Sequence, residues 1–365
     1  MFTLLIFLIV IAVLVLSHEF GHFIVAKWKG MRVDEFGFGF PPRLFGRQFG
    51  ETFYSVNLLP FGGFVRIWGE DDPSFAEASE GAVPELSRNF ASRSVWDRFL
   101  VLVAGVFMNF VLAYIIFIVG HGMGIPSVLG DTQTARDVVV RVVDVIPGSP
   151  AERAGIRMGD GIRELRSASE TLSVTEITEV QEFVKDNAGR DIVLTLERGS
   201  NKIELPVIIR AEAPAGEGLL GIAMAKIGIV SVPWYRAPWE GLRTTFSTTK
   251  VVANGLLFFF TNIFSVEVRS SVAGPVGIAQ VAGEASALGF IYLLQLVAVL
   301  SINLALLNLL PIPALDGGRV FFLLVEKLRG APVSMRTSQF AHTAGFVVLI
   351  FLMLVVTYFD LTRIL

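Results

Sequence analysis

The sequence predicts a polytopic α-helical membrane protein with four transmembrane helices, an inserted α+β domain and a cytoplasmic, membrane-associated β-hairpin region. Hydrophobic residues make up 53% of its 365 residues and charged residues only 17%, whereas soluble domains usually carry about 25% charged residues. Four segments are also apolar over the roughly 20 residues that a helix needs to cross a bilayer. A long polar stretch with alternating and turn-rich patterns separates the second segment from the third.

The four apolar segments set the predicted topology. They are Phe2–Ala26, Phe99–Gly120, Gly289–Leu310 and Phe340–Tyr358. Basic side chains follow the first segment, precede the second, and fill the loop between the third and fourth. These residues are Lys27, Lys29, Arg32, Arg93, Arg98, Arg319, Lys327, Arg329 and Arg336. The positive-inside rule therefore predicts that the hairpin region is cytoplasmic and that the N-terminus, the C-terminus and the inserted domain are extracytoplasmic.

Charge and cysteine content exclude two classes of chemistry. The net charge of -3 gives no basic field that would attract nucleic acid. The chain has no cysteine, so disulfides and thiolate metal ligands are excluded. Any metal ion must therefore be held by His, Asp or Glu side chains.

The stretch between the first two apolar segments has two parts. Residues 33–68 are rich in Gly and Phe and contain alternating runs such as Thr52–Val56, which predict short strands joined by turns. This region is either a plain surface hairpin or an element that binds substrate. Residues 70–97 are acidic and polar, and they predict a mobile loop.

The inserted domain is predicted between Ser127 and Ala211. Strands are expected at Val138–Ile146 and Asp191–Arg198 and a helix at Thr178–Asn187, with a turn and a short helix following the first strand. A small sheet closed by two helices results. The run Val145–Ile162 resembles bacterial PDZ domains, and this resemblance implies a single PDZ domain.

Residues 233–268 predict no fifth span. The apolar run Val251–Phe264 is short and contains Asn254 and Asn262, which is more typical of an interfacial or re-entrant segment. The predicted organisation is therefore in four parts. They are an N-terminal transmembrane half at 1–126, the PDZ domain at 127–212, a juxtamembrane amphipathic or re-entrant region at 213–285, and a C-terminal transmembrane half at 286–365.

The motif His18-Glu19-Phe20-Gly21-His22 lies near the inner end of the first span. Residues four apart share one face of a helix, so His18 and His22 can bind one metal ion with Glu19 beside it as general base. Ionisable residues within a membrane span are costly and usually functional. His121 and His342 have no second ligand at helical spacing and are expected to be structural.

A catalytic zinc normally has three protein ligands and one open position. The third span ends in a proline-containing segment that carries Asp316. Unwound backbone at membrane depth is tolerated only where it is buried in protein or lines a cavity. The first and third spans run in the same direction, so Asp316 is expected at the depth of His18 and His22.

The chain resembles the site-2 protease family of intramembrane zinc metalloproteases, and within it the bacterial RseP type. The resemblance covers nearly the whole chain. It is carried by the HEFGH motif, the PDZ run, and the segments Pro60–Val65, Ala104–Phe110, Gly274–Ala279 and Asn308–Gly318. One departure is visible, because this chain has room for one PDZ domain where the RseP proteins carry two.

The resemblance implies a site and a reaction. His18, His22 and Asp316 would bind Zn²⁺, Glu19 would activate water, and Asn308 would hold the substrate backbone or the developing oxyanion. The strands at Gly62 and Gly63 would pair with an unwound substrate. The substrates would be transmembrane proteins, such as anti-sigma factors or signal-peptide remnants, cleaved in the bacterial inner membrane.

Two alternatives remain open. The first is a membrane-bound zinc peptidase that acts on soluble or signal-type peptides. The second is a non-enzymatic membrane adaptor built around the PDZ domain. The sequence does not determine the natural substrate or the oligomeric state.

Overall fold

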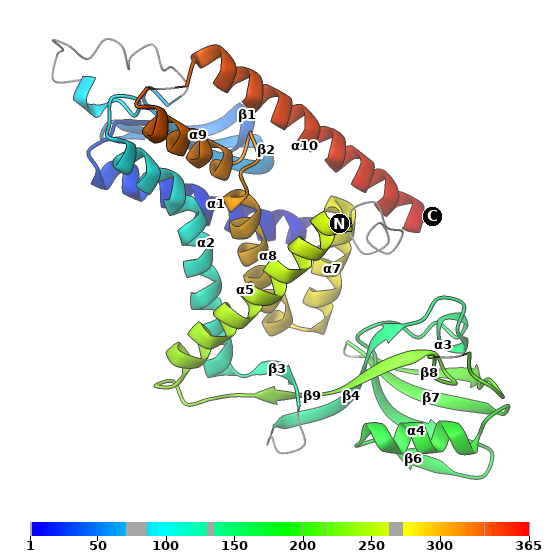
Figure 1. Cartoon of the computed structure of the whole chain (residues 1–365). Helices are drawn as coiled ribbons and strands as arrows, with labels where there is room; N and C mark the ends of the chain where they lie inside the picture. The colour runs from blue at the N-terminus through cyan, green and yellow to red at the C-terminus, as the bar shows by residue number, and fades with distance from the viewer. Residues whose placement is uncertain are drawn as a thin grey trace. The chain divides into compact units, whose positions relative to one another are not determined.

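A computed structural model of the chain describes residues 2–70, 86–129, 135–199, 201–214, 216–262, 273–331 and 333–364. The chain forms two compact units. The first, here called the helical unit, comprises Met1–Phe117, Trp239–Glu284 and Gln295–Leu365. The second, called the sheet unit, comprises Ile118–Pro238 and Ala285–Leu294. Figure 1 shows the helices and strands of both.

Four helices are long and apolar enough to cross a membrane within the described part of the chain. They are α1 (Phe2–Trp28), α2 (Val95–Met123), α8 (Phe290–Leu309) and the Arg336–Thr362 portion of α10 (Met335–Ile364). Each contains most of one predicted apolar segment, so the predicted helices are confirmed as helices. That all four span a bilayer stays a prediction.

Three further helices belong wholly or mostly to the helical unit. They are α5 (Ala237–Thr261), α7 (Pro275–Leu288) and α9 (Asp316–Arg329). Helix α5 is one continuous helix of 25 residues. The apolar run Val251–Phe264 was predicted as a short interfacial or re-entrant segment. Its residues 251–261 instead form the second half of this longer helix, and Asn262 follows the helix end. Residues 263 and 264 of that run lie outside the described residues.

The predicted hairpin is present but its strands are long. Strand β1 (Val33–Phe49) pairs with β2 (Thr52–Ile67). Residues 33–38 pair with 63–67 on one side and with 53–56 on the other, while 43–49 pair with 52–57. The two strands thus fold into four adjacent segments, with 63–67 at one edge. Of the predicted loop at 70–97, residue 70 and the residues from 86 onward are described: a short η2 helix (Leu86–Arg88) begins at 86, and the last three residues belong to α2.

The sheet unit holds a seven-stranded sheet in the order β3-β9-β4-β5-β7-β8, with β6 paired to β5. Its strands are β3 (Ile125–Val128), β4 (Arg136–Val145), β5 (Gly161–Arg166), β6 (Thr171–Ser173), β7 (Asp191–Arg198), β8 (Asn201–Ile208) and β9 (Ile222–Val230). Helices α3 (Pro150–Arg153) and α4 (Ile177–Asp186) accompany it. Alternate residues of the strands and one face of α4 form its buried apolar core.

The predicted boundary of this domain at residue 212 is too early. Strand β9 pairs with β4 from residue 222 onward and with β3 at 227–230, so it is an integral strand of the sheet. Its partners precede it by about 80 residues or more. Pairing over such a distance leaves no local signal, and the sequence therefore assigned 222–230 to the juxtamembrane region.

Candidate metal centre

The HEFGH motif lies on α1, where helical geometry directs both histidines to one side. The His18 and His22 rings are 4.8 Å apart between centroids, and their Nε2 atoms are 3.2 Å apart. Both residues are buried, at 8% exposure. His22 Nδ1 lies 2.8 Å from the Val101 carbonyl of α2. A ring N–H that donates to this carbonyl leaves Nε2 free as a metal ligand.

Two glycines allow α1 and α2 to approach closely at this point. A Cβ on Gly21 would overlap the backbone of Ala104 and come within 2.9 Å of Gly105 Cα. A Cβ on Gly105 would overlap His22 Nε2 and lie 2.8 Å from His18 Cε1. The imidazoles therefore rest directly on the backbone of α2, which fixes their positions.

The third candidate ligand follows a folded loop. Helix α8 ends at Leu309, and α9 begins at Asp316. The loop between them contains two prolines, which stop a helix. Ala314 has a φ of 80°, a conformation that costs about 1–3 kcal/mol for a residue other than glycine. Gly317 and Gly318 allow the first turn of α9 to pack directly against the backbone of residues 309–312. A Cβ on either glycine would overlap backbone carbonyls of that segment.

Contacts from other helices hold this loop and α9. The Ala314 N–H donates to His342 Nδ1 of α10 at 3.0 Å. Arg98 of α2 forms an ion pair with Glu326, and Arg319 of α9 forms one with Glu70. His342, expected to be structural, thus contacts the segment that carries Asp316.

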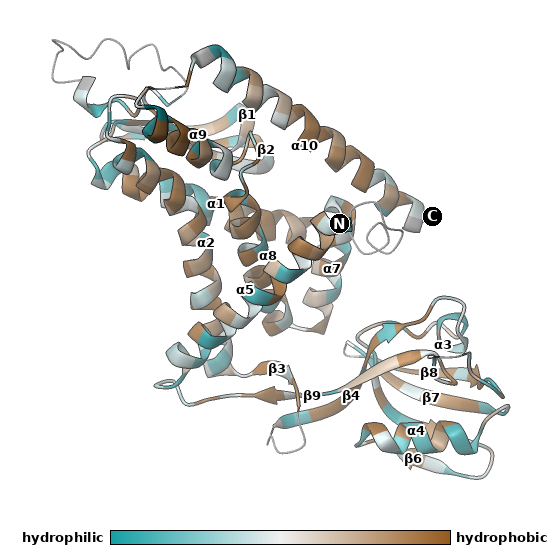
Figure 2. Cartoon of the chain, viewed as in Figure 1, coloured by the Kyte–Doolittle hydropathy of each residue, from teal (hydrophilic) through white to brown (hydrophobic). Residues whose placement is uncertain are grey.

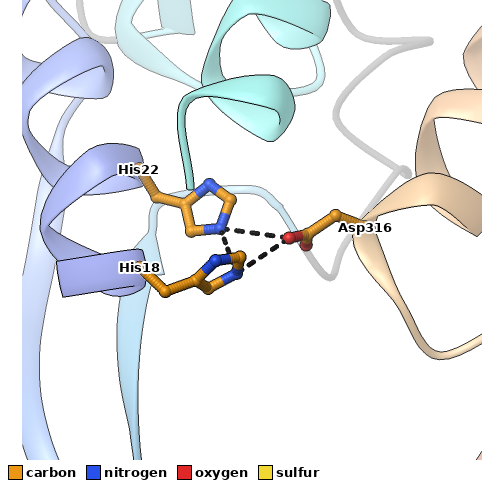
Figure 3. A group of neighbouring side chains, drawn as sticks. All are labelled: His18, His22 and Asp316. Atoms are coloured by element: carbon orange, nitrogen blue, oxygen red, sulfur yellow. Dashed lines mark hydrogen bonds and ion pairs between the residues drawn. The ribbon is translucent and has the colours of Figure 1, made fainter. Parts of the chain in front are cut away.

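The three candidate ligands meet at one point (Figure 3). Asp316 Oδ2 lies 2.9 Å from His18 Nε2 and 3.4 Å from His22 Nε2. This oxygen is buried, and within the described part of the chain its close partners are these two imidazoles. Burial alone would raise the pKa of the Asp316 carboxyl, but the two facing imidazoles outweigh burial and hold this pKa below its ordinary range. A carboxylate facing two imidazole nitrogens fits a divalent cation such as zinc.

Glu19 lies beside these ligands in a cavity of about 440 Å³. The cavity is also lined by Asp316, by Arg319 and by residues 64–67 of β2. A cavity of this size holds several waters and a short stretch of polypeptide. The predicted base and the predicted metal ligands therefore open onto one space that can admit substrate.

The remaining predicted site residues are close to this group, with one shift in position. Asn308 is buried, and its Nδ2 lies 3.4 Å from His18 Nε2. A Cβ on Gly63 would lie 3.3 Å from Glu19 Cγ, so Gly63 packs on α1 beside the base. Gly62 instead faces Phe40. The strand segment that lines the cavity begins one residue later, at Phe64.

Sequence reasoning missed two residues that contact the site or its loop. Asn109 of α2 is fully buried, and its Nδ2 lies 3.4 Å from His18 Nδ1. Its position in an apolar span was a signal, since polar residues there are seldom neutral to function. The contact of His342 with the Ala314 N–H had no comparable signal, because it depends on how α10 packs.

Two histidines and a neighbouring glutamate on the strongly apolar helix α1, with a carboxylate at the start of α9, define a membrane-associated metallopeptidase site. Comparison with known proteins agrees. The profile of peptidase family M50 matches residues 6–352. The chain belongs to peptidase family M50, the site-2 protease family.

Curated relatives are similar over their full length. A Clostridium perfringens protein, provisionally named a zinc metalloprotease, is 34% identical over 97% of both chains. The zinc metalloprotease RasP of Oceanobacillus iheyensis is 29% identical over 100% of this chain and 99% of its own. The regulator of sigma-W protease RasP of Bacillus subtilis is 29% identical over 99% and 98%.

The chain is therefore a zinc metalloprotease and a membrane protein, and its cofactor is Zn²⁺. The predicted family, enzyme class and cofactor are confirmed. The alternative of a non-enzymatic adaptor is wrong, because the whole chain, and not only its sheet unit, matches the protease family.

Proposed function

We propose that this zinc metalloprotease hydrolyses peptide bonds in or near the transmembrane segments of membrane proteins. The observation that carries the proposal is the position of the site. His18, Glu19 and His22 lie within a largely apolar helix of 27 residues, and Asn109 and Asn308 contact His18 from two other such helices. Helices that are apolar enough to cross a membrane surround this site. Such surroundings suit a membrane-embedded substrate better than a soluble peptide.

His18, His22 and Asp316 hold the zinc. When bound, zinc supplies Lewis acidity, polarising a carbonyl and making water a better nucleophile at neutral pH. Glu19 accepts the proton from the attacking water and transfers it to the leaving amide nitrogen. The Asn308 amide lies near His18 Nε2, from where it can donate a hydrogen bond to the substrate carbonyl.

A substrate helix must unwind before it can be cut, because its carbonyls are engaged in hydrogen bonds to the N–H groups four residues on. The edge segment 63–67 of β2 supports strand addition. Residues 64–67 of this segment line the cavity. Among the described residues, the segment forms strand pairs with residues 33–38 on one side only. An unwound substrate on its other side regains the backbone hydrogen bonds that it lost.

The sheet unit is proposed to be a single PDZ domain on the extracytoplasmic side of the bacterial inner membrane. The proposal is supported by the run from Val145 to Ile162, which contains a turn, the α3 helix capped by Ser149, and the start of β5. The asymmetry of Lys and Arg supports the orientation. A reporter fused near residue 170 should be found on the extracytoplasmic side of the membrane, and a reporter fused near residue 80 should be found in the cytoplasm. The opposite pattern would overturn this orientation.

One experiment tests the reaction itself. Purified wild type and the variant Glu19→Gln are given a protein with a single transmembrane helix, and separately a soluble peptide with the same residues around the cut. We expect the wild type to cleave the membrane protein and the variant to be at least about 100-fold slower, since the amide cannot accept a proton. Zinc content should be equal in both.

Two outcomes would contradict the proposal. Turnover of Glu19→Gln within a few fold of wild type would remove Glu19 from the mechanism. Preferred cleavage of the soluble peptide would favour the alternative of a membrane-bound peptidase that acts on soluble or signal-type peptides.

A further inference from the structure

Asn109 stands out among the polar side chains around the zinc site. It is fully buried on α2. Its Nδ2 lies 3.4 Å from His18 Nδ1, and its buried Oδ1 has no hydrogen-bond partner among the residues that the structure describes. The backbone here is held in place, because Ser301 Oγ donates to the Asn109 carbonyl at 2.9 Å. The amide therefore lies beside the ring of a candidate ligand with one of its two polar ends unsatisfied.

The surroundings of His18 restrict which of its nitrogens carries a proton. The amide nitrogens of Asn109 and Asn308 face Nδ1 and Nε2 respectively, each at 3.4 Å. If both amides donated, neither ring nitrogen could carry a hydrogen, whereas a neutral imidazole carries one. One of the two amides must therefore present its oxygen to the ring. Exchanging the oxygen and nitrogen positions of an amide leaves its shape unchanged, so either side chain can turn in this way without a change in packing.

The choice between them follows from the metal. A zinc ligand needs a free lone pair on Nε2, the atom that faces Asp316 and His22. The hydrogen must then be on Nδ1, and Asn109 must accept it. His22 shows the same arrangement with a different partner, since its Nδ1 faces the Val101 carbonyl at 2.8 Å.

We propose that Asn109 is a positioning residue whose Oδ1 accepts the Nδ1–H of His18 and so holds Nε2 toward the zinc. Turning the amide in this way also gives the buried Oδ1 the donor that it lacks. Asn109 lies one helical turn after Gly105, on which the His18 ring rests. One face of α2 thus sets both the location and the tautomer of this ligand. The inference rests on the proposed role of His18 as a zinc ligand.

The test measures zinc affinity in the full-length protein by competition with a chelator. Asn109→Leu keeps the branched shape of the side chain and removes the acceptor, and we expect zinc binding about 10–100-fold weaker, the usual cost of losing a partner behind a metal ligand. Asn109→Asp keeps an acceptor, and we expect affinity within about threefold of wild type or tighter. The absorption spectrum of the Co²⁺-substituted protein, which reports ligand geometry, should change in Asn109→Leu only.

Asn89 provides the matched control, because it is equally buried in the helical unit. Asn89→Leu should leave zinc affinity unchanged. Equal affinity of Asn109→Leu and wild type, or equal weakening in Asn109→Leu and Asn109→Asp, would overturn the inference. The variant His18→Ala distinguishes a failure of the Asn109 inference from a failure of the proposed zinc site. If that variant keeps its zinc, the ligand assignment is wrong, whereas if it loses zinc and Asn109→Leu does not, only the role of Asn109 is wrong.

Discussion

The two units of this chain differ in what their surfaces and interiors contain. In the sheet unit, apolar side chains such as Leu194 and Ile162 are fully buried. The helical unit also buries an apolar cluster that includes Met31, but its α10 helix exposes large apolar side chains, among them Phe351 at 67%. The buried positions of the helical unit include His18, Asn109 and other polar residues. Figure 2 shows this apolar character along α10.

The difference teaches where the stability of each unit comes from. Removal of apolar surface from water stabilises the sheet unit. The helical unit buries an apolar cluster as well, but much apolar surface of α10 stays exposed. On the prediction that this surface faces lipid, packing of small residues and internal hydrogen bonds also hold its helices together. Gly21 and Gly105 provide such packing between α1 and α2. Polar residues inside such a unit are usually functional, and here they form the candidate metal centre.

The largest expected effect comes from removing a polar residue inside the helical unit. Asp316→Ala leaves two imidazole ligands, and we expect the purified protein to lose its stoichiometric zinc. Metal analysis measures this directly. Asp360→Ala is the control, since this buried carboxylate accepts hydrogen bonds from Gly274 and Gly277 and should affect stability but not zinc. A full zinc complement in Asp316→Ala would show that Asp316 is not a ligand.

The second prediction concerns the core of the sheet unit. Leu194→Ala should destabilise this unit by about 2–5 kcal/mol, the usual cost of a large-to-small change in a core. Denaturant unfolding of the full chain in detergent, followed by fluorescence or circular dichroism, measures the change. Zinc binding should be unaffected. A loss below about 1 kcal/mol would mean that this core contributes little to the stability of the unit.

The same substitution in both units tests the comparison most directly. Phe351 of α10 and Ile208 of β8 are equally exposed, at 67% and 68%. Phe351→Lys places a charge on a lipid-facing helix and should cost about 3 kcal/mol of membrane insertion. Ile208→Lys faces water and should change stability by less than about 0.5 kcal/mol. Insertion assays and thermal unfolding distinguish the two, and equal effects would refute lipid exposure of α10.

The smallest effect concerns the loop before Asp316. Ala314 has a φ of 80°, so Ala314→Gly should be neutral or stabilising by about 0.5 kcal/mol, because relief of strain exceeds the added freedom of the unfolded chain. Ala305→Gly is the matched change inside α8, and it should destabilise by about 1 kcal/mol. Thermal unfolding gives the sign of each. Destabilisation by both would mean that the loop stores no strain.

Local patterns in the sequence predicted much of this structure. The apolar runs located the four long helices, because helix-forming segments are continuous in sequence. The i, i+4 spacing placed His18 and His22 on one face, and the broken end of α8 indicated Asp316. Each of these features depends on neighbouring residues only.

What the sequence did not predict depends on distant parts of the chain. Strand β9 joins the sheet through partners in β3 and β4. Asn109 and His342 reach the site or its loop through the packing of α2 and α10. The segment of β2 that lines the cavity, residues 64–67, was also not predicted, because strand register in a four-segment sheet is set by tertiary contacts.

The distance in sequence between the candidate zinc ligands has a consequence for biosynthesis. Asn308, which is not one of these ligands, already lies 290 residues after His18, and the third candidate ligand, Asp316, follows it. A nascent chain presents Glu19 and both histidines long before it contains the carboxylate that completes a three-ligand set. The order of translation therefore keeps the site incomplete until most of the chain has been made. The time that the ribosome needs to reach Asp316 is therefore the minimum delay before this protease can become active.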